Sequence, residues 1–232
     1  MVIHTFFDLL AAVASLGVTA FCYRWRLSDA AARIEAGGAG YVMALLLGAA
    51  AGGYGFGSLN MVLSGTPMVS RSVVGALAGA ITAIELFKWM RGLSGSTGLI
   101  FVPAFATTVI VGRWGCFLSG LADETHGTPT TLPWGVDLGD GVARHPVQLY
   151  ESFTMAAFLL AALVLIGRRN PWFMRNGFYA LVLVYAVQRF AWEFLKPYAQ
   201  VAGPFNLFHL VCGGLAVYAV TMMRRNHERT TA

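Results

Sequence analysis

Residues 97–119, with the sequence TGLIFVPAFATTVIVGRWGCFLS, carry a single charged side chain, that of Arg113. A helix needs about 20 mainly apolar residues to cross the roughly 30 Å hydrocarbon core of a bilayer. This stretch is therefore predicted to be a transmembrane helix with one charge inside it.

Further stretches have a similar length and composition, at residues 5–23, 40–63, 72–90, 147–166, 177–195 and 205–223. Of the 232 residues, 57% are hydrophobic and only 12% are charged, whereas soluble domains carry about 25% charged residues. We expect an all-α polytopic membrane bundle of seven transmembrane helices, forming one domain over residues 1–232 with a periplasmic loop at 120–145. The first stretch is expected to be a retained helix, because its basic residues follow the apolar run instead of preceding it.

Basic residues concentrate on alternate connections between these stretches. Eleven of the sixteen lie there, namely Arg24, Arg26, Arg33, Lys88, Arg91, Arg168, Arg169, Arg175, Arg224, Arg225 and Arg229. Because an excess of Lys and Arg marks the cytoplasmic side, the N-terminus is predicted to be periplasmic and the C-terminus cytoplasmic. The net charge of +5 comes mainly from these clusters, so we expect a lipid bilayer and no nucleic acid as partner.

Glycines recur four residues apart in the second and third predicted spans, at Gly48 and Gly52 and at Gly75 and Gly79. Small residues at this spacing let two membrane helices approach closely. The glycine-rich run at 53–57 follows no predicted strand, so helix packing is favoured over a nucleotide-binding loop.

Polar side chains gather near the predicted outer ends of the spans. Arg113 lies about 9 Å from the end of its helix, at a rise of roughly 1.5 Å per residue. Arg189 and Glu193 are four residues apart on one face and are expected to pair. Others at this level are Asp8, Asn60, Arg71, Ser72, Gln148, Tyr150, Glu151, Asn206 and His209. Ionisable groups within membrane helices indicate a functional site, although side chains at helix ends also reach water without any function.

The sequence Arg144-His145-Pro146 precedes the fifth predicted span. Proline suits the first turn of a helix, where free backbone amides attract phosphate. With Arg113 at the same level, the expected ligand is the headgroup of an outer-leaflet phospholipid.

Several motifs resemble those of the prolipoprotein diacylglyceryl transferase family, which reads roughly GRxGNF, PWG and RHPSQLYE. The matching residues here are Gly112-Arg113-Trp114-Gly115-Cys116-Phe117, Leu132-Pro133-Trp134-Gly135 and Arg144-His145-Pro146-Val147-Gln148-Leu149-Tyr150-Glu151, with Arg189 and Glu193 similar to a later RxxxE. The resemblance implies a multi-pass protein of the bacterial inner membrane. It also implies a transferase in lipoprotein biosynthesis, which moves the diacylglyceryl group of phosphatidylglycerol to the lipobox cysteine of a preprolipoprotein signal peptide.

The resemblance and the polar residues around these motifs together indicate roles for individual residues. Catalytic roles are expected for Arg113, Arg189 and Glu151, with His145 and His126 as candidate general bases. Residues expected to bind substrate are Arg113, Arg144, Gln148, Tyr150, Gly115, Cys116 and Glu193. No cofactor and no metal ion are expected, because the acidic loop with Asp123, Glu124 and His126 is interpreted as solvated polar groups.

Three departures from the family pattern leave alternatives open. Cys116 replaces the asparagine of GRxGNF, Leu121 replaces an acidic residue, and residues 74–76 lack the histidine of the family's HGG segment. His126 and His145 lie near acidic residues that can raise the basicity of an imidazole, while Cys116 is expected to be a small packing residue. The alternatives are a divergent paralogue with another acceptor and a non-catalytic protein that binds or moves phospholipid.

Overall fold

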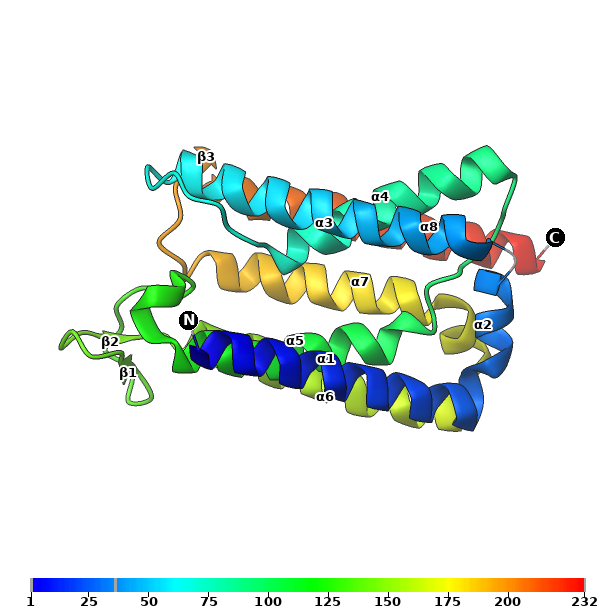
Figure 1. The fold of residues 1–232 in the computed structure, drawn as a ribbon, viewed down its shortest axis with the longest axis horizontal. Helices are drawn as coiled ribbons and strands as arrows, with labels where there is room; N and C mark the ends of the chain where they lie inside the picture. Colours follow the sequence, from blue (N-terminus) through cyan, green and yellow to red (C-terminus); the bar gives the residue numbers. More distant parts are fainter. Residues whose placement is uncertain (1, 36, 232) are drawn as a thin grey trace.

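The computed structural model describes residues 2–35 and 37–231, which form an almost entirely helical bundle (Figure 1). Within these residues the long helices are α1 (Val2–Cys22), α3 (Gly38–Leu63), α4 (Val73–Arg91), α5 (Phe101–Leu118), α6 (Val147–Gly167), α7 (Pro171–Glu193) and α8 (Leu207–Thr231). They occupy the seven predicted stretches, with ends shifted by a few residues. The predicted all-α bundle is therefore confirmed.

Six of these helices, all except α7, are long and apolar enough to cross a membrane, as judged over the described part of the chain. The exception has a physical cause, because α7 carries the buried polar residues Asn176, Gln188, Arg189 and Glu193. It packs against α5, α6 and α8 and lies between other helices of the bundle (Figure 1). A central helix can present polar groups to protein without exposing them to lipid. The structure thus confirms a multi-pass membrane protein but supports six, not seven, spans by composition.

Short elements that the sequence does not predict complete the two ends of the bundle. At one end, the π-helix η1 (Tyr23–Leu27) leads into the helix α2 (Ser28–Glu35). The opposite end holds the 3-10 helix η2 (Gly120–Asp123) and two antiparallel hairpins, β1 (Val136–Asp137) with β2 (Ala143–Arg144) and β3 (Gln200–Ala202) with β4 (Phe205–Asn206). The predicted loop at 120–145 is therefore folded, and it lies at the end where α1 begins (Figure 1).

The glycines of α3 and α4 bring the two helix backbones into contact, as predicted. A Cβ atom placed on Gly75 would lie 2.5 Å from the carbonyl oxygen of Gly52. A Cβ on Gly79 would overlap the carbonyl oxygen of Gly48. Because backbone cannot move aside as a flexible side chain can, glycine is required at this crossing.

We predict that Gly79→Ala destabilises the protein by about 1–3 kcal/mol through overpacking. The matched control is Gly55→Ala, also in a long helix, where a Cβ has no neighbour within 4 Å. Alanine there should be neutral or stabilising, because it is the better helix former. Unfolding in detergent micelles measures both changes, and equal stability of the two variants would contradict the packing argument.

Candidate active site

A cluster of five charged side chains lies inside the bundle near the hairpin end. Arg113 Nε is 2.8 Å from Glu151 Oε2, and Lys196 Nζ is 2.8 Å from Glu151 Oε1. Arg189 pairs with both Glu151 and Glu193. Each of these residues is at most 7% exposed. Burying a charge is costly unless the charge is paired. The ion pairs between three helices and the segment after α7 therefore offset the cost of burying these five side chains.

Further polar contacts hold the cluster in place. Asn206, in β4, donates from Nδ2 to Glu193 Oε2 at 3.0 Å, and its own Oδ1 accepts from the backbone N–H of His209. Ser152, next to Glu151, donates to the carbonyl oxygen of Ile110 at 2.9 Å. The second bond ties α6 to α5 one turn from Arg113, so the two ion-pair partners are held by their backbones.

The formal charges of the cluster do not cancel. Arg113, Arg189 and Lys196 supply three positive charges, and Glu151 and Glu193 supply two negative charges. This leaves one positive charge in a nearly dry environment, where electrostatic attraction is much stronger than in water. The cluster is therefore suited to receive a monoanionic group such as a phosphodiester.

The structure brings together four of the residues that the sequence singles out. Arg113, Glu151, Arg189 and Glu193 are all members of the cluster, and the predicted pairing of Arg189 with Glu193 is confirmed. Arg113 faces the interior of the bundle, with 7% of the residue exposed. Lys196 completes the set, and its spacing of three residues from Glu193 was the signal that could have revealed it.

Arg144, Tyr150 and the two candidate histidines lie in the hairpin region instead. Arg144 binds both carboxylate oxygens of Asp140, at 2.6 and 2.7 Å. His145 Nδ1 is 3.5 Å from Tyr150 Oη. Burial, followed by the positive charge of Arg144, lowers the pKa of His126. Within the described residues no hydrogen bond or ion pair links these side chains to Arg113 or Arg189.

Two details of the predicted site need correction. The first helical residue of α6 is Val147, with Pro146 as its N-cap. The amides of Val147 and Leu149 donate to the carbonyl oxygens of His145 and Pro146, so they are not free to bind phosphate. Gly115, expected to bind substrate, is instead covered by Phe7 of α1, which packs directly against it.

A second polar cluster lies beside Arg113 and includes a residue that the sequence interpretation missed. His4 Nε2 is 3.0 Å from Asp123 Oδ1 and 3.8 Å from Cys116 Sγ. Its other ring nitrogen, Nδ1, is 3.1 Å from Asp8 Oδ2. His4 and Asp8 are four residues apart in an otherwise apolar helix, and that spacing was the available signal.

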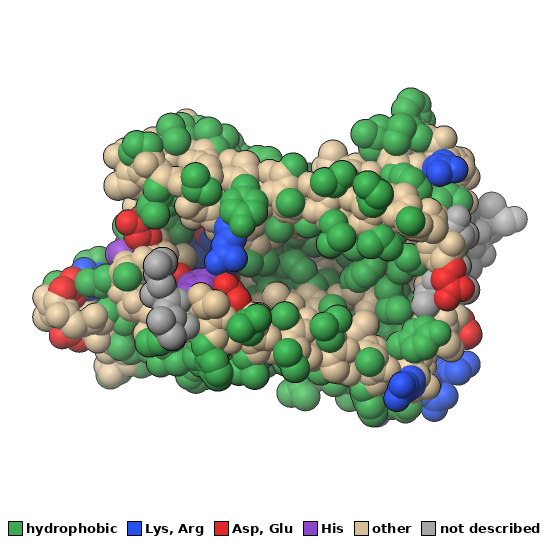
Figure 2. All heavy atoms as spheres, viewed as in Figure 1, with side chains coloured by type: hydrophobic (Ala, Val, Ile, Leu, Met, Phe, Trp, Pro, Cys, Tyr) green, Lys and Arg blue, Asp and Glu red, His purple; other side chains and the backbone are tan. Residues whose placement is uncertain are grey.

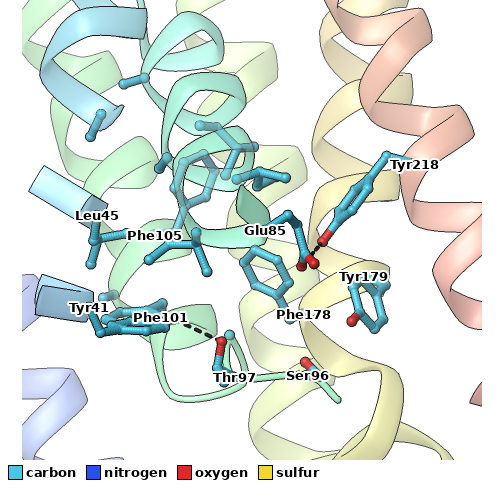
Figure 3. Close-up of a pocket in the computed structure, with 18 of the residues that line it drawn as sticks. Tyr41, Leu45, Glu85, Ser96, Thr97, Phe101, Phe105, Phe178, Tyr179 and Tyr218 are labelled. Atoms are coloured by element: carbon cyan, nitrogen blue, oxygen red, sulfur yellow. Dashed lines mark hydrogen bonds between the residues drawn. The ribbon is translucent and has the colours of Figure 1, made fainter. Parts of the chain in front are cut away.

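An apolar cavity of about 280 Å³ extends from the middle of the bundle toward the end opposite the hairpins. Its walls come from α3, α4, α5, α7 and α8, with Leu45, Phe101, Phe105 and Phe178 among the lining side chains (Figure 3). Glu85, which also lines the cavity, accepts a hydrogen bond from Tyr218 Oη at 2.8 Å. Figure 2 shows a hollow between the α3 and α1 sides, with histidine, acidic and basic side chains at the left and apolar walls elsewhere.

Comparison with known proteins agrees with this geometry. Residues 70–225 match the family model described as prolipoprotein diacylglyceryl transferase. The chain belongs to this family. Arg113, Glu151, Arg189 and Glu193 all lie inside the matched range, so the buried cluster is part of the family region.

Curated family members from several bacteria are similar to this chain over part of their length. The phosphatidylglycerol–prolipoprotein diacylglyceryl transferase of Geobacter sulfurreducens is 35% identical over 131 residues, covering 53% of this chain and 48% of the relative. That of Finegoldia magna is 34% identical over 124 residues, covering 53% and 48%. That of Nitratidesulfovibrio vulgaris strain DP4 is 31% identical over 166 residues, covering 66% and 61%. The chain thus spans about half to three-fifths of the length of these relatives.

We predict that Glu151→Gln destabilises the protein by about 3–5 kcal/mol, because it leaves two arginines and a lysine facing one buried carboxylate. The control is Asp140→Asn, which breaks the exposed pair with Arg144 and should change stability little. Chemical denaturation in micelles compares the two. Equal losses of unfolding free energy in the two variants would show that the Glu151 ion pairs do not stabilise the fold.

Proposed function

We propose that this chain is a membrane transferase that moves the diacylglyceryl group of phosphatidylglycerol to the cysteine thiol of a preprolipoprotein signal peptide. The observation that carries the proposal is the excess positive charge of the buried cluster, with Arg113 contacting Glu151 of the RHPVQLYE motif. The relatives bear the name of this activity, and the family match covers the whole cluster.

The proposed reaction is a displacement at carbon. The acceptor thiol loses its proton, its sulfur forms a bond to the glycerol carbon, and the bond from that carbon to the phosphate oxygen breaks. Glycerol phosphate leaves with the electron pair and takes up one proton. Negative charge grows on the phosphate during this step, and fixed cations that already face it stabilise the transition state.

In this scheme Arg113 and Arg189 bind the phosphate, and Glu151 positions both guanidinium groups through its ion pairs. A guanidinium offers several N–H donors in one plane, so pairing with a carboxylate leaves donors for a phosphodiester. Glu193 and Lys196 hold Arg189 and Glu151 in turn. His126 and His145 are left out of the mechanism because their contacts lie in the hairpin region.

The proposed topology has seven spans, with α7 crossing inside the bundle, in the bacterial inner membrane. The hairpin end, the 120–145 loop and the N-terminus face the periplasm, and the C-terminus faces the cytoplasm. Support comes from the basic residues at the α2 end, such as Arg24 and Arg26 in η1 and Arg168 after α6. This orientation places the cluster at the level of outer-leaflet headgroups.

The apolar cavity is proposed to hold an acyl chain of the donor lipid. It is lined largely by aliphatic and aromatic side chains, and burial of methylene groups contributes about 0.8 kcal/mol each. A headgroup at Arg113 and a chain in the cavity together explain why a charged cluster and an apolar hollow share one bundle.

We predict that Arg113→Ala lowers the rate of thioether formation by about 10²–10³-fold, the size of effect seen when one transition-state donor is removed. The assay combines purified protein, labelled phosphatidylglycerol and a lipobox peptide. Arg168→Ala, at the opposite end of α6, should keep the full rate. Product from Arg113→Ala at the unaltered rate would refute the proposed role, and lipid binding without any product would favour the non-catalytic alternative.

We predict that Ala80→Phe, which fills the cavity from α4, raises KM for long-chain phosphatidylglycerol more than for a short-chain analogue. The control Leu46→Phe lies on α3 with 62% of the residue exposed and should alter neither value. The ratio of the two KM values measures the effect. An unchanged ratio in Ala80→Phe would exclude the cavity as an acyl site.

A further inference from the structure

Three potential metal ligands from separate elements converge beside Arg113. His4 belongs to α1, Cys116 to α5 and Asp123 to η2. One ligand atom from each lies within 4.8 Å of the other two. Nitrogen, sulfur and carboxylate oxygen form the donor set that proteins use for zinc.

The spacing of these atoms suits a tetrahedral ion. Zinc–ligand distances of about 2.0–2.3 Å imply ligand–ligand edges of roughly 3.3–3.6 Å. The corresponding edges here are 3.0 Å from His4 Nε2 to Asp123 Oδ1 and 3.8 Å from His4 Nε2 to Cys116 Sγ. Both edges lie within a few tenths of an ångström of that range, and the third, from Cys116 to Asp123, is within 4.8 Å.

Outer contacts orient two of the ligands as metal sites require. Asp8 faces the other ring nitrogen of His4 at 3.1 Å and can accept its proton, which would leave Nε2 with a lone pair for an ion. Thr125 donates its hydroxyl to the second oxygen of Asp123, and Gln148 reaches Thr125 at 3.4 Å. Hydrogen-bonded carboxylates behind a ligating histidine are the usual second layer of a zinc site.

The packing of α1 on α5 creates the convergence. Phe7 sits directly on Gly115, where any larger residue would push α1 away. This contact keeps His4 next to Cys116. The Asp123 carboxylate is buried, with 8% of its side chain exposed, while His4 is 27% exposed. The site is thus enclosed by protein on one side and open on the other.

We propose that His4, Cys116 and Asp123 bind a divalent zinc-like ion whose fourth position receives the acceptor thiol. Three protein ligands with one open position are the pattern of catalytic zinc sites. No metal ion is expected from the acidic loop alone. The site becomes apparent only when His4 of the first helix is placed beside that loop.

This inference rests on the proposed function and supplies its missing thiol activation. A thiol that bound such an ion would lose its proton. Its sulfur would then attack the glycerol carbon as the bond from that carbon to the phosphate oxygen breaks, and glycerol phosphate would leave with the electron pair and take up the released proton. Arg113 Nη1 lies 3.9 Å from Cys116 Sγ, so nucleophile and leaving group would meet at adjacent sites.

The test titrates the chelator-treated protein, with all 232 residues, in micelles with Co²⁺, an optical substitute for zinc. We expect one ion per chain and a sulfur-to-cobalt charge-transfer band that Zn²⁺ abolishes. Cys116→Ser should remove the band, and Asp8→Asn should weaken binding by about 10–100-fold. The control Cys22→Ser changes a thiol buried elsewhere in the core and should retain both.

A correctly folded wild-type protein without the band would overturn the proposal, and so would a band that persists in Cys116→Ser. Full thioether formation by the metal-free protein would also overturn it. If that activity were lost in His4→Ala, proton transfer would be assigned to His4 alone. Metal binding without any thioether product would instead refute the proposed function and leave the metal site standing. The two failures are therefore distinguishable.

Discussion

Three cationic side chains share the Glu151 carboxylate at the centre of the bundle, and this carboxylate has no exposed surface. Removing charges from water costs several kcal/mol per ion, and only close, hydrogen-bonded partners offset that cost. Glu151 therefore fixes the relative positions of α5, α6 and the end of α7. Any helix movement that separates one cation would leave it buried without a partner. The geometry of the cluster is thus set by electrostatics more than by local helix preference.

The rest of the fold follows from keeping that cluster dry while leaving a path to it. α7 carries polar residues along its buried faces and is surrounded by more apolar helices. α3 and α4 contact each other through Gly52 and Gly75, so they form a thin wall on one side of the apolar cavity. Flexible helices around the cluster would not stabilise the transition state, because a buried cation stabilises developing negative charge only when it is already in place.

Much of this could be predicted from the sequence, because membrane burial leaves strong signals. Apolar runs located the seven helices, and the four-residue spacing of Arg189 and Glu193 predicted their ion pair. Contacts between distant elements left weaker signals. Nothing local indicates that Glu151 meets Lys196, which lies 45 residues further along the chain. The position of Pro146 at the N-cap was also inaccessible, because helix ends depend on hydrogen bonds that the pattern does not show.

The replacement of the family's asparagine by Cys116 gains a physical interpretation from its neighbours. A packing thiol would need only apolar contacts, yet this sulfur faces a histidine, a carboxylate and a guanidinium. A histidine nitrogen and a carboxylate oxygen beside a thiol are the surroundings of a metal ligand more than of a packing side chain. Residues 74–76 lack the histidine of the family's HGG segment, while His4 of the first helix lies 3.8 Å from Cys116 Sγ. The cysteine in place of asparagine and the missing third-span histidine each weaken the resemblance when taken alone. Together they are consistent with one site, in which Cys116 and His4 activate the acceptor thiol.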